Sequence, residues 1–178
     1  AGRINFIYGP FSLYTEYAYK INDPNKVNGE IFKPGQALYI TANYSTKGLG
    51  VNASFKRIDN MNYRSDRNAT GNVLNLNYLP AISKNQSYRL ATLYPYATQP
   101  NGEIGFMGEV FYTFKPKSKL GGEYGTSISL NGSHINNIDI QPTGDEYGYN
   151  SDFFKIGDPL FFQDINVEVT KKINKDLK

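Results

Sequence analysis

Hydrophobic and polar residues alternate with a period of two along much of the chain, most clearly over residues 11–21. The apolar and aromatic set is Phe11, Leu13, Thr15, Tyr17, Tyr19 and Ile21, and the polar or small set is Ser12, Tyr14, Glu16, Ala18 and Lys20. This alternation predicts a β-strand with one apolar face. The segment has the length of a strand that crosses a bilayer at a tilt, and its aromatic ends match the interfacial girdle of membrane strands.

The same alternation predicts about nine strands and no long helix. The predicted strands cover residues 3–8, 11–21, 37–44, 49–58, 72–79, 86–94, 103–114, 120–133 and 160–172.

The short connections allow the strand register to be predicted. The Gly9-Pro10 turn pairs Tyr8 with Phe11, and the turn 45–48 pairs Tyr44 with Leu49. The basic turn 115–119 places Val110 opposite Tyr124. In each hairpin the apolar faces of the two strands coincide, as a one-sided sheet requires.

The connections alternate between short and long. The short ones are 9–10, 45–48, 80–85 and 115–119, and the long ones are 22–36, 59–71, 95–102 and 134–159. In an up-and-down sheet all short turns then lie at one end, as in outer-membrane barrels. The sequence therefore predicts an all-β antiparallel meander in a single domain, 1–178, that forms a transmembrane β-barrel or part of one.

Composition narrows the possible chemistry. The chain has 15 Tyr, 11 Phe and no Trp. Without Cys, disulfides and thiolate metal sites are excluded. The net charge of +3 is too small to indicate a nucleic-acid partner. No signal peptide precedes the first strand, so we expect a processed chain or a piece of a longer protein.

Five segments carry a family resemblance: NFIYGPFSLYTEYAYK, KPGQALYI, FKRIDNMNYRSDRN, LYPYATQPNGEIGFMGEVFY and FFQDINVEV. Together they resemble uncharacterised outer-membrane β-barrel proteins of the Bacteroidetes type. The resemblance implies a barrel in the outer membrane and an internal or C-terminal part of a longer family member. It implies no activity and no catalytic residues.

Charged residues at polar strand positions are the first candidate site, as lumen-facing groups of a barrel. They are Glu16, Lys20, Lys56, Arg89, Glu109, Glu123, Asp164 and Glu168. The acids among them could line a cation-preferring path. We favour ordinary interior polar residues that pair with the nearby lysines and arginine, because barrel interiors are polar by default.

The long loops supply two further candidates. Acids at Asp139, Asp145, Glu146, Asp152 and Asp158 could bind Ca²⁺, but their spacing does not match an EF-hand, and we favour a solvated loop. Aromatics at Tyr63, Tyr147, Tyr149, Phe153 and Phe154 are candidate contacts for a sugar or a partner protein, or they fold inward.

The residue pattern gives no support for a catalytic site. His134 is the only histidine, and its neighbour Ser133 points to the opposite face of the same strand. We expect no catalytic residue, no metal and no cofactor.

The expected function is therefore non-enzymatic. The chain is predicted to act as a pore, a scaffold or a subunit of a larger complex in the outer membrane of a Gram-negative bacterium. Its expected partners are outer-membrane lipid and other subunits of such a complex. The alternative is a soluble β-sandwich that binds glycans, in which the alternation separates core from water.

Overall fold

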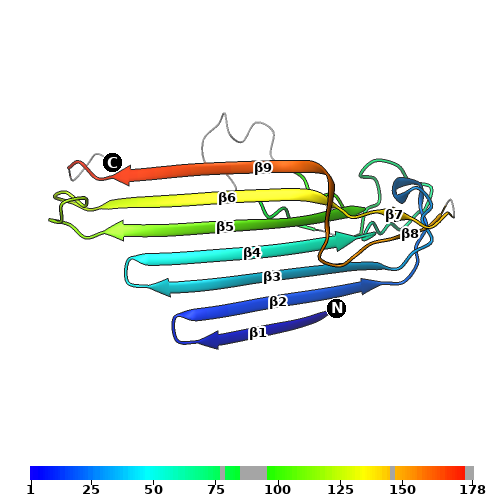
Figure 1. Ribbon diagram of the computed structural model, residues 1–178, viewed down its shortest axis with the longest axis horizontal. Helices are drawn as coiled ribbons and strands as arrows, with labels where there is room; N and C mark the ends of the chain where they lie inside the picture. The colour runs from blue at the N-terminus through cyan, green and yellow to red at the C-terminus, as the bar shows by residue number, and fades with distance from the viewer. Residues whose placement is uncertain (77–78, 85–95, 145–146, 175–178) are drawn as a thin grey trace.

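The computed structural model describes residues 1–76, 79–84, 96–144 and 147–174 and has an all-β architecture (Figure 1). The main strands are β1 (Gly2–Tyr8), β2 (Phe11–Lys20), β3 (Gly35–Thr46), β4 (Leu49–Asp59), β5 (Gly102–Phe114), β6 (Thr126–Ile138) and β9 (Ile156–Lys171). The strands β7 (Gln141–Pro142) and β8 (Tyr149–Asn150) form a small separate hairpin, and a single 3₁₀ turn, η1, covers Lys26–Asn28.

The seven main strands form one antiparallel sheet in the order β1-β2-β3-β4-β5-β6-β9. The connections 21–34, 60–101 and 139–155 leave and rejoin the sheet at one end of the strands, here called the loop end. The turns 9–10, 47–48 and 115–125 lie at the opposite end, the turn end (Figure 1). The predicted up-and-down meander is thus confirmed, with its long and short connections at opposite ends.

The first hairpin has the predicted register, with Tyr8 opposite Phe11. In the second hairpin Leu49 pairs with Thr46, so the predicted pairing with Tyr44 is wrong. The turn consists of Lys47 and Gly48 alone, and Gly48 adopts a φ of +84°, a left-handed conformation that glycine reaches without steric cost. The shift of two residues leaves every side chain on its predicted face.

The predicted strand 120–133 begins only at Thr126. Residues 115–125 form a compact turn that needs left-handed backbone at Gly122 and Gly125, with φ of +62° and +97°. Val110 consequently pairs with Leu130 instead of Tyr124. The displacement is again an even number of residues, so Leu130 still lies on the predicted apolar face.

The predicted strand 72–79 is wrong for the residues that the structure describes, and the predicted strand 86–94 lies outside them. Residues 71–74 form turns, and Asn75 makes only an isolated bridge to Arg64. The Arg64 guanidinium donates to the carbonyls of Val73 and Gly71, which holds this stretch in a compact loop. β4 pairs directly with β5, so no hairpin separates them.

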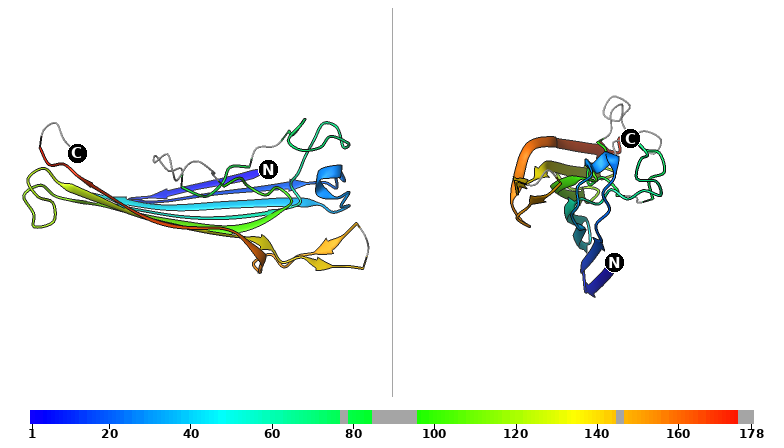
Figure 2. Two further views of the ribbon diagram at one scale, coloured as in Figure 1. Left: turned by 90° about the horizontal axis from the view of Figure 1, so that it is seen from above. Right: turned by 90° about the vertical axis from the view of Figure 1, so that its right-hand side faces the viewer.

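The sheet has an apolar face and a polar face, which differ in what covers them (Figure 2). The apolar face bears a large exposed set that includes Phe6, Phe106, Val110, Leu130, Ile165 and Val167. The polar face is covered by part of the segment 60–101, and the β7–β8 hairpin projects from the opposite side at the loop end. No helix in the described part of the chain is long and apolar enough to cross a membrane.

Candidate functional site: the polar face and the covered loop end

A row of polar side chains crosses the polar face from strand to strand. Its members pair in register and are Asn43, Asn52, Glu109, Asn131 and Asn166. Asn52 donates to Asn43 Oδ1 at 2.6 Å, and Asn166 donates to Asn131 Oδ1 at 3.2 Å. Side-chain amides and carboxylates in register give this face a continuous hydrogen-bonding surface, as in the interior of a barrel.

The segment 60–101 is attached to the polar face through Lys56. Its Nζ lies 2.7 Å from Glu103 Oε1 in an ion pair whose side chains are 5% and 0% exposed. The same ammonium donates to the carbonyl of Pro80 at 2.7 Å and to Thr98 Oγ1 at 2.8 Å. A buried ammonium needs such partners, since an isolated buried charge is strongly unfavourable.

Glu103 is held from the covering segment as well. The Tyr96 hydroxyl and the Gln99 backbone N–H both donate to Glu103 Oε2. Burial, reinforced by this hydrogen bond to a carboxylate, raises the pKa of Tyr96. Glu103 therefore joins β5 both to Lys56 of β4 and to Tyr96 and Gln99 of the covering segment.

A second attachment lies nearer the middle of the sheet. Lys84 Nζ donates to Glu109 Oε1 at 2.8 Å, and Ser129 donates to the same oxygen at 3.0 Å. Between the two attachments Ile82 is 4% exposed and packs over Gly105, where an added Cβ would lie 3.0 Å from Ile82 Cδ1. In the described part of the segment, Lys84 and Ile82 therefore add a second point of attachment to the one formed by Lys56 and Glu103.

The predicted lumen residues divide into three groups. Six occupy polar-face positions in the sheet, namely Glu16, Lys20, Lys56, Glu109, Asp164 and Glu168. Glu123 lies in the turn 115–125, so its placement on a strand is wrong, because the glycines of that turn delay β6. Arg89 lies outside the described residues.

The apolar face carries a buried charged cluster at the loop end, around Asp59. Lys33 Nζ lies 2.6 Å and Arg57 Nη2 lies 3.2 Å from Asp59 Oδ2, and the Tyr149 hydroxyl donates to Oδ1 at 2.5 Å. The Phe153 ring covers the Arg57 guanidinium, 4.6 Å from its centroid. The segment 139–155 therefore shields charges that would otherwise interrupt the apolar face.

The cluster alters the acid–base behaviour of its members. Burial, followed by the proximity of the Asp59 carboxylate, raises the pKa of Tyr149. Burial lowers the pKa of Lys33, although the hydrogen bond and charge of Asp59 oppose this effect.

The five loop aromatics separate into inward and outward groups. Tyr149 and Phe153 fold onto the cluster around Asp59. Tyr63, Tyr147 and Phe154 are 46%, 49% and 75% exposed. The outward group retains the surface that a ligand or partner contact requires, and the inward group serves the packing of the loop.

Two of the acidic loop residues, Asp139 and Asp152, are engaged by neighbours, and Asp158 lies within β9, so its predicted loop position is wrong. Asp139 accepts from Gln141 and pairs with Lys155 at 3.2 Å, and these two contacts lower its pKa. Asp152 also accepts from Gln141, and Asp145 and Glu146 lie outside the described residues. Among the described residues, no group of three or more His, Asp or Glu side chains is placed to hold a metal ion.

Ser133 and His134 lie on opposite faces of β6. Ser133 is 4% exposed on the polar face opposite Asp164, and His134 is exposed on the apolar face opposite Gln163. This geometry separates the hydroxyl from the imidazole, so the two cannot act as nucleophile and base.

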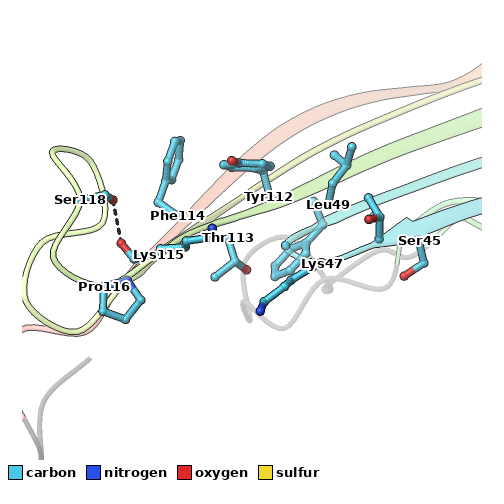
Figure 3. A pocket seen from close by; sticks show the side chains of 13 residues that line it. Ser45, Lys47, Leu49, Tyr112, Thr113, Phe114, Lys115, Pro116 and Ser118 are labelled. Atoms are coloured by element: carbon cyan, nitrogen blue, oxygen red, sulfur yellow. Dashed lines mark hydrogen bonds between the residues drawn. The ribbon is translucent and has the colours of Figure 1, made fainter. Parts of the chain in front are cut away.

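A hollow at the turn end lies between the turns 47–48 and 115–125 (Figure 3). Leu49, Tyr112 and Phe114 project to one side of it, and Lys47 and Pro116 project to the other. The rings of Tyr112 and Phe114 pack edge to face, with their centroids 4.8 Å apart. The hollow thus combines an aromatic border with basic turn residues and holds no convergent catalytic groups.

Four residues that organise these sites were not among the predicted ones: Arg57, Asp59, Lys84 and Glu103. Arg57 and Asp59 occupy apolar-face positions of β4, and this break in the alternation is a signal that the loop end is covered. Lys84 and Glu103 carry no such signal, because their partners are set by the path of the segment 60–101.

The sequence model of a family described as a family of unknown function, DUF6029, matches residues 1–178. The chain belongs to this family. No curated protein and no solved structure gives a significant match to it. The resemblance to an uncharacterised family is confirmed to this extent.

Proposed function

We propose that this DUF6029 chain forms part of the wall of a β-barrel in the outer membrane of a Gram-negative bacterium. The apolar face contacts lipid, and the polar face contacts the lumen. The role is non-enzymatic, as a scaffold or a subunit of a larger outer-membrane complex. The resemblance of five segments to Bacteroidetes-type outer-membrane barrels supports this location.

The observation that carries the proposal is the contrast between the two faces. Ile165, Val167 and Phe106 on the apolar face are 72%, 64% and 46% exposed, and Lys56 and Glu103 on the polar face are buried. A water-soluble sheet has the reverse arrangement, with its apolar face packed and its polar face solvated. A sheet in lipid tolerates an apolar outer face because the bilayer covers it.

Aromatic residues border the apolar face at both ends, which supports the proposal further. Tyr8, Tyr44 and Tyr112 lie toward the turn end and are at least 41% exposed, and Tyr17 and Tyr19 lie toward the loop end. Phe11 and Tyr19 are separated by about 27 Å along β2, using a rise of about 3.4 Å per residue. This separation is of the order of the apolar band of membrane barrels.

The strand directions constrain how such a barrel closes. β1 and β9 both run from the loop end to the turn end, because seven antiparallel strands place equivalent directions at the two sheet edges. Direct pairing of β1 with β9 would be parallel. Closure with antiparallel pairing throughout requires an odd number of strands beyond those of this sheet, which gives the even total typical of bacterial barrels.

The covered polar face favours a scaffold or subunit over an open pore. Pro80, Ile82 and Lys84 lie against the lumen side of β4 and β5 through the contacts of Lys56, Gly105 and Glu109. These contacts occupy space that a water-filled channel would need. The glycan-binding sandwich is less well supported, because among the described residues the apolar face is covered only at its loop end, by Lys33 and by the segment that carries Tyr149 and Phe153.

Fractionation of cells that express the natural protein tests the proposal. We expect the protein in the outer-membrane fraction, with faster gel migration before boiling than after it, because closed barrels resist detergent until heated. A known outer-membrane barrel and a periplasmic protein from the same cells serve as controls. A product that fractionates with the periplasmic control and migrates independently of boiling would overturn the proposal.

A further inference from the structure

A polar hollow of about 600 Å³ lies at the loop end between the end of β2 and the start of the segment 60–101. Its border includes Tyr19, Lys20, Asp23, Tyr63, Arg64 and Arg67. The hollow has a net positive charge, because Lys20, Arg64 and Arg67 outnumber the single carboxylate of Asp23. It is separate from the attachments of the polar face and from the cluster around Asp59.

The loops that form the hollow are rigidly connected. Lys20 Nζ donates to the carbonyl of Asn62 at 2.6 Å, and Asn28 donates to Asn60 Oδ1 at 2.9 Å. The backbone N–H of Lys26 donates to the carbonyl of Arg67 at 2.9 Å. The two walls are therefore held in a fixed relation, which is the preorganisation that a binding site requires.

The two arginines of the hollow differ in what they can still bind. Arg64 is 5% exposed and donates to Asn62 and to two backbone carbonyls, so each of its three guanidinium nitrogens has a partner. The Arg67 side chain is 66% exposed, and Asp23 holds it through Nε alone, with the Asp23 Oδ1 to Arg67 Nε distance at 3.2 Å. Within the described residues the two terminal nitrogens of Arg67 have no hydrogen-bond partner, which leaves them free to form a fork for an oxyanion.

Two tyrosines line the same hollow as Arg67. Tyr19 and Tyr63 are 59% and 46% exposed and come from the two opposite walls. Exposed tyrosines offer a ring face to an apolar or planar surface and a hydroxyl to a polar group. The C–H face of a sugar ring and its hydroxyls match this combination.

We infer that this hollow binds an anionic saccharide, whose acidic group pairs with Arg67 and whose ring packs against Tyr63. Asp23 is a positioning residue that aims the guanidinium. Arg64 and Lys20 hold the walls and contribute positive potential. This inference goes beyond the proposed barrel role and stands independently of membrane location, because it rests on the loop end alone.

Binding of acidic oligosaccharides to the purified full chain in detergent tests the inference. The probes are trigalacturonate, a hyaluronan tetrasaccharide, fully methyl-esterified trigalacturonate and inorganic phosphate, measured by calorimetry. We expect saturable binding of at least one acidic saccharide with a Kd on the order of 1 mM or tighter. Replacing Arg67 by Gln should weaken binding at least about tenfold, because the charge-assisted fork is lost.

Matched variants make the result decisive. Arg67→Lys keeps the charge without the fork and should bind more weakly than the natural chain, and Tyr63→Ala should lose saccharide binding without a change in strand content. Lys47→Gln, at the turn end, removes the same charge far from the hollow and should bind as the natural chain does. The inference is overturned if neither acidic saccharide binds, if the methyl ester or phosphate binds equally well, or if Lys47→Gln weakens binding as much as Arg67→Gln.

Discussion

Lys56 of β4 and Glu103 of β5 form a diagonal ion pair on the polar face, with Nζ 2.7 Å from Oε1 and both side chains buried. Each also binds the segment that crosses this face, through Pro80 and Thr98 on one side and Tyr96 and Gln99 on the other. The pair therefore joins two strands to the segment that covers them.

Replacing Lys56 by Met should destabilise the protein by about 3–5 kcal/mol, because Glu103 is left as a buried charge without its cation. The double variant Lys56→Met/Glu103→Met should recover part of this loss. Reversible urea unfolding in detergent measures the effect, with Lys47→Met at an exposed turn as the control. Equal stability of the Lys56 and Lys47 variants would contradict the assigned role of the pair.

Two glycines of β5 should respond differently to alanine. A Cβ at Gly105 would lie 2.9 Å from Ile135 Cγ1 and 3.0 Å from Ile82 Cδ1, whereas a Cβ at Gly108 meets no atom within 4 Å. Gly105→Ala should therefore cost about 1–3 kcal/mol by displacing Ile82, as overpacking does. Gly108→Ala should be neutral or slightly stabilising. The same unfolding assay compares them, and a neutral Gly105→Ala would show that Ile82 does not pack there.

The cluster around Asp59 predicts a stability loss at alkaline pH. The folded-state pKa of Tyr149 is raised. Its contribution to stability is therefore fully present below the unfolded-state pKa of about 10, and it is lost as the pH rises above that value. Tyr149→Phe should cost about 1.5–3 kcal/mol near neutral pH by removing a hydrogen bond to a carboxylate.

Unfolding midpoints at about pH 8 and about pH 11, on either side of the ordinary tyrosine pKa, check this prediction. The natural chain should lose more stability between the two pH values than Tyr149→Phe does. Tyr147→Phe, which removes the hydroxyl of a half-exposed neighbour, is the matched control. An identical alkaline loss in the natural chain and Tyr149→Phe would exclude Tyr149 as its source.

Arginine substitutions on the two faces of β9 should differ in their cost to stability in lipid. Val167 is 64% exposed on the apolar face, and its neighbour Asn166 lies on the polar face. In vesicles Val167→Arg should cost about 2–4 kcal/mol if its position is near the bilayer centre, and Asn166→Arg far less. In water both changes would be inexpensive, because an exposed valine tolerates arginine. Comparable stability of the two variants in vesicles would place the apolar face outside lipid.

The strands and their faces could be predicted because alternation with a period of two is a local property. The register errors at Leu49 and Val110 were shifts by even numbers of residues, so they preserved the face of every side chain. The compact turn before Thr126 was missed because its left-handed glycines resemble ordinary small strand residues in sequence.

The segment 60–101 could not be predicted in the same way. Its alternating residues near Leu74 and Leu76 suggested a strand, but hydrogen bonds from Arg64 hold this stretch as turns. The partners of Lys56 lie 24 and 42 residues away in the sequence, so no local pattern reveals them. The predicted polar-face residues were largely placed correctly, and their ion-pair partners were not.

Collision accessibility of single spin labels along β9 in lipid vesicles distinguishes a lipid-facing apolar face from a solvated one. The chain contains no Cys, so each introduced cysteine at residues 164–169 is a unique labelling site. Labels at 165, 167 and 169 should collide with oxygen dissolved in lipid, and labels at 164, 166 and 168 should be shielded from it. Access of a water-soluble paramagnetic reagent to 165, 167 and 169, with no period-two alternation in oxygen collisions, would contradict a lipid-facing apolar face.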